Sequence, residues 1–291
     1  MPATPDVPAT PDASGLPAMP RPPDRPDGAP LRLVVLTDLD DTLFQTARKL
    51  PAADATRSTL AARASNGHDS FATPRQLALL DWMDPARCIP VTARGTEAYS
   101  RVALPFAGPA AIVANGAVIL DADGCVNTDW QTRVQAALAP LRPLLDGLPE
   151  RLLAEADRHG LSIRTWLVQE PGCDGVYAVA KCNDDPSGAP LRLLVPALLE
   201  HLGIEDGVAD PGDEGTRWRM HLNGNNLALI PPGVSKALAT VWLLERLRRD
   251  GELLAIGVGD SSSDLAFMRA CDLWMTPSGS QLDRAWGGPP A

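Results

Sequence analysis

The amino-acid sequence predicts an α/β protein with a doubly wound, mostly parallel sheet that is interrupted by an inserted α+β layer. The sheet is predicted because short apolar runs alternate with helical stretches over residues 31–117, and the same alternation returns over residues 231–291. The inserted layer is predicted because the stretch between them, residues 118–230, mixes hairpin patterns with helices. A length of 291 residues is enough for about two domains.

The chain begins with a segment that we expect to be disordered. Residues 1–30 contain ten prolines among Ala, Asp, Thr and Gly, a composition that buries too little apolar surface to offset the entropy lost on ordering. The first strand is predicted at residues 31–36, where the apolar run is continuous rather than alternating, as in a strand covered on both faces. Residues 45–72 are polar and alanine-rich without clear periodicity, which predicts a long loop that could act as a flap.

The first predicted helix has a recognisable start. Thr73 can cap its N-terminus and Pro74 suits the first helical position, with Leu77, Leu80 and Met83 on the buried side. The same kinds of pattern predict the remaining elements. They are strands 88–91 and 111–114 with a helix over about 96–102 between them; a strand at 118–120; helices across about 129–159; a hairpin of strands 162–168 and 176–181; a helix over about 190–203; strands 217–222 and 226–230; and then helix 235–249, strand 253–258 and strand 273–275.

Acidic residues follow two of the predicted parallel strands. Asp38 and Asp40 come directly after the first strand, on one face of an extended chain, where they repel each other unless a cation lies between them or one takes a proton. Asp41 would point to the opposite face, so we expect no chemical role for it. Asp260 and Asp264 follow a later strand. Because ligands of such sheets lie beyond the carboxyl ends of the strands, we expect both acidic pairs at the same edge.

Four segments, in this order along the chain, resemble the motifs of the haloacid dehalogenase (HAD) superfamily of phosphotransferases. They are Asp38-Leu39-Asp40-Asp41-Thr42-Leu43, Val91-Thr92-Ala93-Arg94, Lys236, and Gly259-Asp260-Ser261-Ser262-Ser263-Asp264. The insert, with Asn115-Gly116-Ala117 and the run 231–236, resembles subfamily IIB, which includes sucrose-, trehalose- and mannosylglycerate-phosphate phosphatases, Cof-type phosphatases and phosphomannomutases. The resemblance implies a Rossmann-like HAD core at residues 31–117 and 231–291, with an inserted cap at 118–230.

The resemblance also implies a Mg²⁺-dependent phosphatase acting on a small phosphorylated metabolite, with a sugar phosphate favoured. Asp38 would be the nucleophile that forms an aspartyl-phosphate, and Asp40 would protonate the leaving alkoxide and later deprotonate the attacking water. Lys236 and the Thr92 hydroxyl would hold the charged oxygens. The resemblance places Mg²⁺ on the Asp38 carboxylate, the backbone carbonyl of Asp40 and Asp260, with Asp264 close by or in a second layer.

Candidate substrate-binding residues lie in both parts of the chain. Thr92, Ala93, Arg94, Asn115 and Gly116 are assigned to the phosphate end, and Asn223 and Asn226 to a hairpin tip of the cap, where Asn225, Arg217 and Arg219 are further candidates. Two alternatives stay open, namely a phosphomutase of the same superfamily and a regulator that binds a phosphorylated metabolite without turnover. A receiver-type signalling domain ranks last, because it places its phosphorylated Asp at the third strand and has no large insert.

Composition excludes several other functions. The net charge of −10 argues against a general nucleic-acid binder. Five scattered cysteines without a Cys-x-x-Cys pair predict a reduced, cytoplasmic compartment and no zinc site. No signal peptide is expected, because the first residues lack a basic start followed by an apolar core. The charge-free run 102–120 contains Pro105, Gly108 and Pro109, so no membrane span is expected. The expected partner is a small phosphorylated molecule, with no obligate protein partner.

Overall fold

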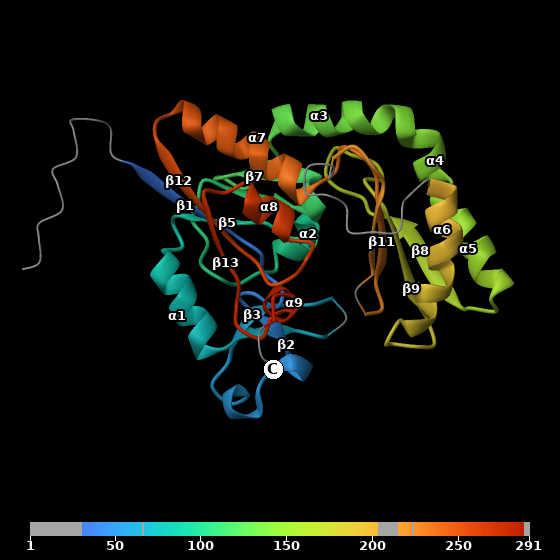
Figure 1. Ribbon diagram of the computed structural model, residues 1–291, viewed down its shortest axis with the longest axis horizontal. Helices are drawn as coiled ribbons and strands as arrows, with labels where there is room; N and C mark the ends of the chain where they lie inside the picture. Colours follow the sequence, from blue (N-terminus) through green and yellow to red (C-terminus); the bar gives the residue numbers. More distant parts are fainter. Residues whose placement is uncertain (1–30, 66, 203–214, 223, 288–291) are drawn as a thin grey trace, which may run out of the picture. The chain divides into compact units, whose positions relative to one another are not determined.

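The first predicted strand lies inside a parallel sheet. The computed structural model (Figure 1) describes residues 31–65, 67–202, 215–222 and 224–287, so the predicted tail at 1–30 lies outside the described residues. The strand order is β13-β12-β1-β5, and every neighbouring pair runs parallel. These strands are β1 (Arg32–Thr37), β5 (Cys88–Pro90), β12 (Leu253–Val258) and β13 (Leu273–Met275). The predicted α/β class is confirmed.

The sheet continues beyond β5 in a different way. Val91 forms a parallel bridge with Ile112 of β6 (Ala110–Val113), which places this strand beside the end of β5. The next strand, β7 (Val118–Asp121), turns back antiparallel to β6, with Val118 opposite Val113. Between them, residues Ala114–Gly116 form a single 3₁₀ turn. The turn at Asn115 and Gly116 therefore joins a hairpin at the edge of the sheet.

The helices of the parallel sheet begin where the sequence predicts. Thr73 caps α1 (Pro74–Met83) in a reciprocal capping box with Gln76, and Ser235 caps α7 (Lys236–Arg249). The predicted helix at 96–102 is shorter, because α2 covers only Thr96–Tyr99. Two short helices complete this part, α8 (Leu265–Arg269) and α9 (Gln281–Ala285).

The prediction of a loop without secondary structure at residues 45–72 is wrong. The segment contains a small antiparallel sheet of order β2-β4-β3, formed by Gln45–Thr46, Ser70–Ala72 and Thr59–Ala62. Its buried side chains are small: Ala61, Ala62 and Ala72 are at most 1% exposed. Strands this short, with alanine as the buried residue, give no strong period-two pattern of large apolar side chains. The rest of the segment includes 3₁₀ turns at Ala47–Lys49 and Ala52–Asp54.

A second, antiparallel sheet of order β10-β11-β9-β8 confirms both predicted hairpins. Its strands are β8 (Ile163–Leu167), β9 (Ala178–Cys182), β10 (Arg219–Leu222) and β11 (Leu227–Ile230). Helices α5 (Leu148–Arg158) and α6 (Val195–Leu202) lie beside it (Figure 1). The helices that precede it are α3 (Thr128–Leu138) and α4 (Arg142–Asp146), with 3₁₀ turns at Ala139–Leu141 and Ala189–Leu194. The boundaries of the inserted layer at 118 and 230 stay predictions.

An aromatic contact joins α3 to the helix that carries Lys236. The ring of Trp130, only 1% exposed, lies 5.3 Å from the ring of Trp242 on α7. The two helices run near each other in Figure 1. The indole Nε1–H of Trp130 donates to the carbonyl of Gly116 at 3.0 Å, so α3, α7 and the β6–β7 turn pack as one unit. Among the described residues, no helix combines the length and apolar character that crossing a bilayer would require.

Candidate active site

Three side chains from distant parts of the chain meet at the carboxyl edge of the parallel sheet. The backbone N–H of Asp38 donates to the carbonyl of Val258 at 2.8 Å, which fixes Asp38 between the ends of β1 and β12. The ammonium of Lys236 donates to Asp38 Oδ1 at 2.8 Å and to Asp264 Oδ1 at 2.7 Å. Asp38, Lys236 and Asp264 are 6%, 7% and 1% exposed. The sequence prediction that these residues share one site agrees with this geometry.

Lys236 occupies a position that is unfavourable without anionic partners. It is the first residue of α7, where the helix dipole disfavours a cation, and it is buried. Burial alone would lower the pKa of the Lys236 ammonium, but the charges of Asp264 and Asp38 outweigh it and raise the pKa above its ordinary value. The lysine is therefore held as a buried cation between two carboxylates.

The carboxylates are suited to hold a divalent cation as well. One oxygen from each of Asp38, Asp260 and Asp264 lies within 4.8 Å of the others. Burial and then the charge of Asp264 raise the pKa of Asp38 well above its usual range, and the same two causes raise that of Asp260 to about 7. One lysine cannot balance three carboxylates, and Mg²⁺ prefers oxygen ligands, so these residues fit a magnesium ion.

The two oxygens of Asp264 already have donors. Oδ1 accepts from Lys236, and Oδ2 accepts from the backbone N–H of Ser261 at 3.1 Å and from its hydroxyl at 2.7 Å. Thr42 contributes a weaker contact, since its hydroxyl lies 3.4 Å from Asp38 Oδ2 and 3.5 Å from Asp260 Oδ1. Asp38 and Asp260 are thus the carboxylates freer to reach a metal, while Asp264 orients the lysine. Ser261 is a contributor that the motif reading left without a role.

Asp40 makes a different contact from the other acidic residues. Its carboxylate, half exposed, forms a bidentate pair with Arg94, with Nε donating to Oδ2 and Nη2 to Oδ1, both at 2.8 Å. The Arg94 guanidinium also lies over the ring of Phe44, 4.9 Å from its centroid. Arg94 was predicted to bind substrate, and in this structure its charge is directed to Asp40. A metal contact of Asp40 through its backbone carbonyl stays a prediction.

The backbone N–H and the carboxylate of Asp41 both make local contacts in the segment that follows β1. Its φ of 65° is left-handed, its N–H donates to the carbonyl of Phe44 at 2.7 Å, and its carboxylate pairs with Lys49 at 2.5 Å. The expectation that Asp41 takes no part in the chemistry stays a prediction.

The predicted phosphate-end residues lie in two adjoining loops. The hydroxyl of Thr92, a residue 1% exposed, accepts from the backbone N–H of Arg94 at 3.1 Å, and the carbonyl of Thr92 accepts from Asn115 N at 3.1 Å. Ala114, Asn115 and Gly116 all have positive φ, of 51°, 58° and 90°. A Cβ on Gly116 would lie 2.1 Å from the carbonyl oxygen of Ser235, so this turn presses directly on the cap of α7.

The predicted cap residues give a mixed picture. Asn223 lies outside the described residues, and Asn226 directly precedes β11. The amide of Asn225 bonds both backbone groups of Cys182, accepting from N at 2.6 Å and donating to O at 2.9 Å. Asn225 therefore joins its turn to β9, and a role in specificity has no support there.

Two residues that the sequence analysis did not select, Glu170 and Tyr177, connect the loop between β8 and β9 to the segment that follows Thr92. Both oxygens of Glu170 accept from the N–H of Thr96, at 3.0 and 3.3 Å, and the hydroxyl of Tyr177 donates to the carbonyl of Ala93 at 3.4 Å. The signal that the sequence offered was modest: Glu170 lies between the predicted strands 162–168 and 176–181, and Tyr177 lies near the start of the second strand.

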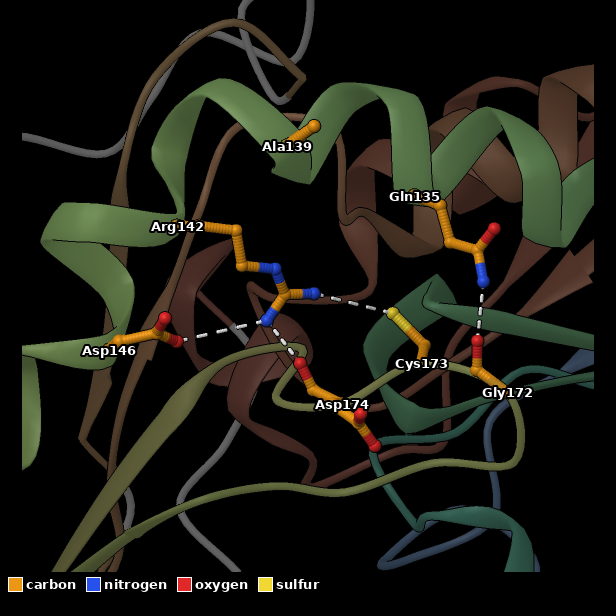
Figure 2. Close-up of a pocket in the computed structure, with 7 residues that line it drawn as sticks. All are labelled: Gln135, Ala139, Arg142, Asp146, Gly172, Cys173 and Asp174. Atoms are coloured by element: carbon orange, nitrogen blue, oxygen red, sulfur yellow. Dashed lines mark hydrogen bonds and ion pairs between the residues drawn. The ribbon is translucent and has the colours of Figure 1, made fainter.

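A pocket lies between the loop that joins β8 to β9 and the helical residues 135–146. Figure 2 shows its lining, formed by Gln135, Ala139, Arg142, Asp146, Gly172, Cys173 and Asp174, around a volume of about 520 Å³. None of these residues belongs to the carboxylate site. The pocket therefore does not locate the chemistry, but it shows how Gln135 and Arg142 hold the loop.

No protein-family model and no curated protein sequence matches the chain. Solved structures do match it over most of its length. The sucrose-phosphatase of Synechocystis, solved with sucrose and phosphate, is 15% identical, and the match covers 88% of this chain and 86% of that one at a TM-score of 0.48. A haloacid dehalogenase-like hydrolase from Bacteroides thetaiotaomicron is 14% identical, with 85% and 94% covered and a TM-score of 0.43.

A trehalose-6-phosphate phosphatase related protein is 18% identical, with 84% of each chain covered and a TM-score of 0.42. The structural neighbours of the chain thus include haloacid dehalogenase-like hydrolases and phosphatases. At these low identities and TM-scores, the case for a function rests on the geometry of the site.

Proposed function

We propose that the protein is a Mg²⁺-dependent phosphatase that hydrolyses a small phosphorylated metabolite, with a sugar phosphate as the favoured class. The observation that carries the proposal is the buried Asp38, 2.8 Å from the Lys236 ammonium, with carboxylate oxygens of Asp260 and Asp264 nearby. A nucleophilic carboxylate beside a fixed cation and a site suited to a metal is the arrangement that phosphoryl transfer needs, because its transition state is stabilised chiefly by positioning and charge.

In the first step a carboxylate oxygen of Asp38 attacks phosphorus, and the bond from phosphorus to the leaving oxygen breaks as the aspartyl-phosphate forms. Lys236 keeps Asp38 oriented and offsets negative charge on the phosphoryl group. The Thr92 hydroxyl and nearby backbone N–H groups would donate to the phosphoryl oxygens. A magnesium ion held by Asp38 and Asp260 would supply the positive charge that allows an anionic nucleophile to approach an anionic phosphate.

Asp40 moves the protons in both steps. It donates a proton to the leaving alkoxide, and in the second step its carboxylate takes a proton from the water that attacks the aspartyl-phosphate. The bidentate contact with Arg94 is compatible with this role, because a carboxylate offers about four lone-pair sites and Arg94 uses one on each oxygen.

The test is phosphate release from a panel of phosphorylated metabolites, with Mg²⁺ and with chelator. The wild type should release phosphate only with Mg²⁺, and Asp38→Asn should abolish turnover. Asp41→Asn is the matched control: it makes the same change three residues away, at a left-handed position that Asn adopts readily, and should retain activity.

Several outcomes would contradict the proposal. Turnover by Asp38→Asn would refute the nucleophile, and full activity in chelator would refute the metal. Dependence on a sugar bisphosphate with transfer back to the sugar would identify a mutase. Metabolite binding without phosphate release would identify a regulator.

A further inference from the structure

The loop between β8 and β9 docks on the segment that follows Thr92. Glu170 is only 8% exposed, and both its carboxylate oxygens accept from Thr96 N. The approach needs a glycine beside it, since a Cβ on Gly95 would lie 2.2 Å from Glu170 Oε1. At the other end of the loop Tyr177, 5% exposed, donates to the carbonyl of Ala93. The segment 93–96 is thus held at both ends by the inserted layer.

The same loop is fixed from its other side by helices α3 and α4. Gln131 Nε2 donates to the carbonyl of Pro171 at 2.7 Å, and Gln135 Nε2 donates to the carbonyl of Gly172 at 2.5 Å. Arg142 donates to the carbonyl of Gly175 at 2.7 Å and to that of Asp174; Figure 2 shows the contacts of Gln135 with Gly172 and of Arg142 with Asp174. Side chains held by such a second layer of contacts are presented in one geometry. Glu170 and Tyr177 are therefore pre-organised.

The segment that these two residues hold carries Arg94. The carbonyl of Ala93 and the N–H of Thr96 flank Arg94 on either side along the chain, and the Arg94 guanidinium makes two 2.8 Å bonds to Asp40. A shift of this short segment would shift the guanidinium, and with it the Asp40 carboxylate. The contacts form a continuous path from α3 and α4, through the loop, to the proposed proton carrier.

We propose that Glu170 and Tyr177 are positioning residues that hold Arg94 so that Arg94 aligns Asp40 for protonation of the leaving oxygen. The inference rests on the proposed phosphatase function. In the step concerned, the proton leaves the Asp40 carboxyl for the leaving oxygen as the bond from that oxygen to phosphorus breaks. Loss of either positioning residue should therefore slow the hydrolysis of substrates with a basic leaving group. It should leave nearly unchanged the hydrolysis of substrates whose leaving group departs without a proton.

The experiment compares kcat/KM for phenyl phosphate and 2,4-dinitrophenyl phosphate in Mg²⁺, because this ratio reports the steps up to release of the leaving group. In Glu170→Ala and Tyr177→Phe, kcat/KM for phenyl phosphate should fall at least about tenfold, which is part of the roughly 10²–10⁴-fold that general acid catalysis contributes. The value for 2,4-dinitrophenyl phosphate should stay nearly unchanged. Glu170→Gln keeps an acceptor oxygen for Thr96 N, so it should retain most of the activity on phenyl phosphate.

Two further variants separate positioning from general damage. Glu155→Ala removes a carboxylate that pairs with Arg158 on its own helix, α5, and should leave kcat/KM unchanged for both substrates. In a protein that already carries Arg94→Met, adding Glu170→Ala should not lower kcat/KM for phenyl phosphate any further relative to that for 2,4-dinitrophenyl phosphate, because Glu170 acts through Arg94.

Equal losses on both substrates, or full activity of Glu170→Ala on phenyl phosphate, would overturn the inference. If thermal unfolding shows that Glu170→Ala is not folded, Tyr177→Phe decides alone, since it removes a single hydroxyl. A wild type that releases phosphate in Mg²⁺ neither from these two esters nor from any member of the metabolite panel would refute the phosphatase itself, and the inference with it.

Discussion

Gly116→Ala should damage both stability and activity, because this residue touches the backbone that positions Lys236. With φ at 90°, the added Cβ would lie 2.1 Å from Ser235 O and 2.7 Å from Lys236 N. Ordinary contacts between heavy atoms are about 3.5 Å or longer, so the start of α7 would have to move by about 1 Å. Ser235 caps that helix, and Lys236 follows it directly.

The cost has two parts that a matched glycine can separate. A positive φ disfavours alanine by about 1–2 kcal/mol, and overpacking of a filled site adds about 1–3 kcal/mol. Gly124, in the exposed turn after β7, has φ of 81°, and a Cβ there would meet no heavy atom of the described residues within 4 Å. We therefore expect Gly124→Ala to lower the free energy of unfolding by about 1–2 kcal/mol, and Gly116→Ala by about 2–5 kcal/mol.

Urea unfolding followed by circular dichroism gives the two free energies, and phosphate release in Mg²⁺ gives kcat. Moving the Lys236 ammonium by about 1 Å from its 2.8 Å contact with Asp38 should lower kcat about 100-fold in Gly116→Ala. Gly124→Ala should keep wild-type kcat. Equal losses of stability in the two variants, or full activity in Gly116→Ala, would refute the idea that this close approach places the lysine.

Three other substitutions test the site and its support. Lys236→Met leaves buried carboxylates without their cation, so without metal it should lower the free energy of unfolding in urea by about 3–5 kcal/mol, and added Mg²⁺ should restore part of the loss. Mg²⁺ should raise the Tm of the wild type in thermal scans and leave that of Asp260→Asn nearly unchanged; equal shifts in both would exclude Asp260 as a ligand. Trp130→Phe removes the donor to the buried carbonyl of Gly116 and should cost about 1–3 kcal/mol in urea unfolding, whereas an unchanged midpoint would show that this hydrogen bond carries no net stability.

The parts of the fold that sequence predicts well are those written in local patterns. The capping box at Thr73 is complete within four residues, and it begins α1 at the expected position. The approach of Asp38 to Asp260 is also predictable, because parallel strands bring their carboxyl ends to one edge, and Thr37 pairs with Val258.

Contacts between side chains and distant backbone groups leave no such pattern. Nothing local indicates that Arg94 turns to Asp40, or that Glu170 reaches the N–H of Thr96, 74 positions away. The sheet at residues 45–72 was missed for a different reason, since strands of two to four residues with buried alanines lack the large alternating side chains that reveal a strand.

The buried Lys236 has a consequence for how the proposed metal ion could be exchanged. Because an internal ammonium already bridges Asp38 and Asp264, the strand ends are held together by the chain's own charge. Small zinc domains, by contrast, unfold when their metal is removed. We therefore expect the metal-free protein to remain folded, so that dialysis can replace one divalent ion by another without a refolding step.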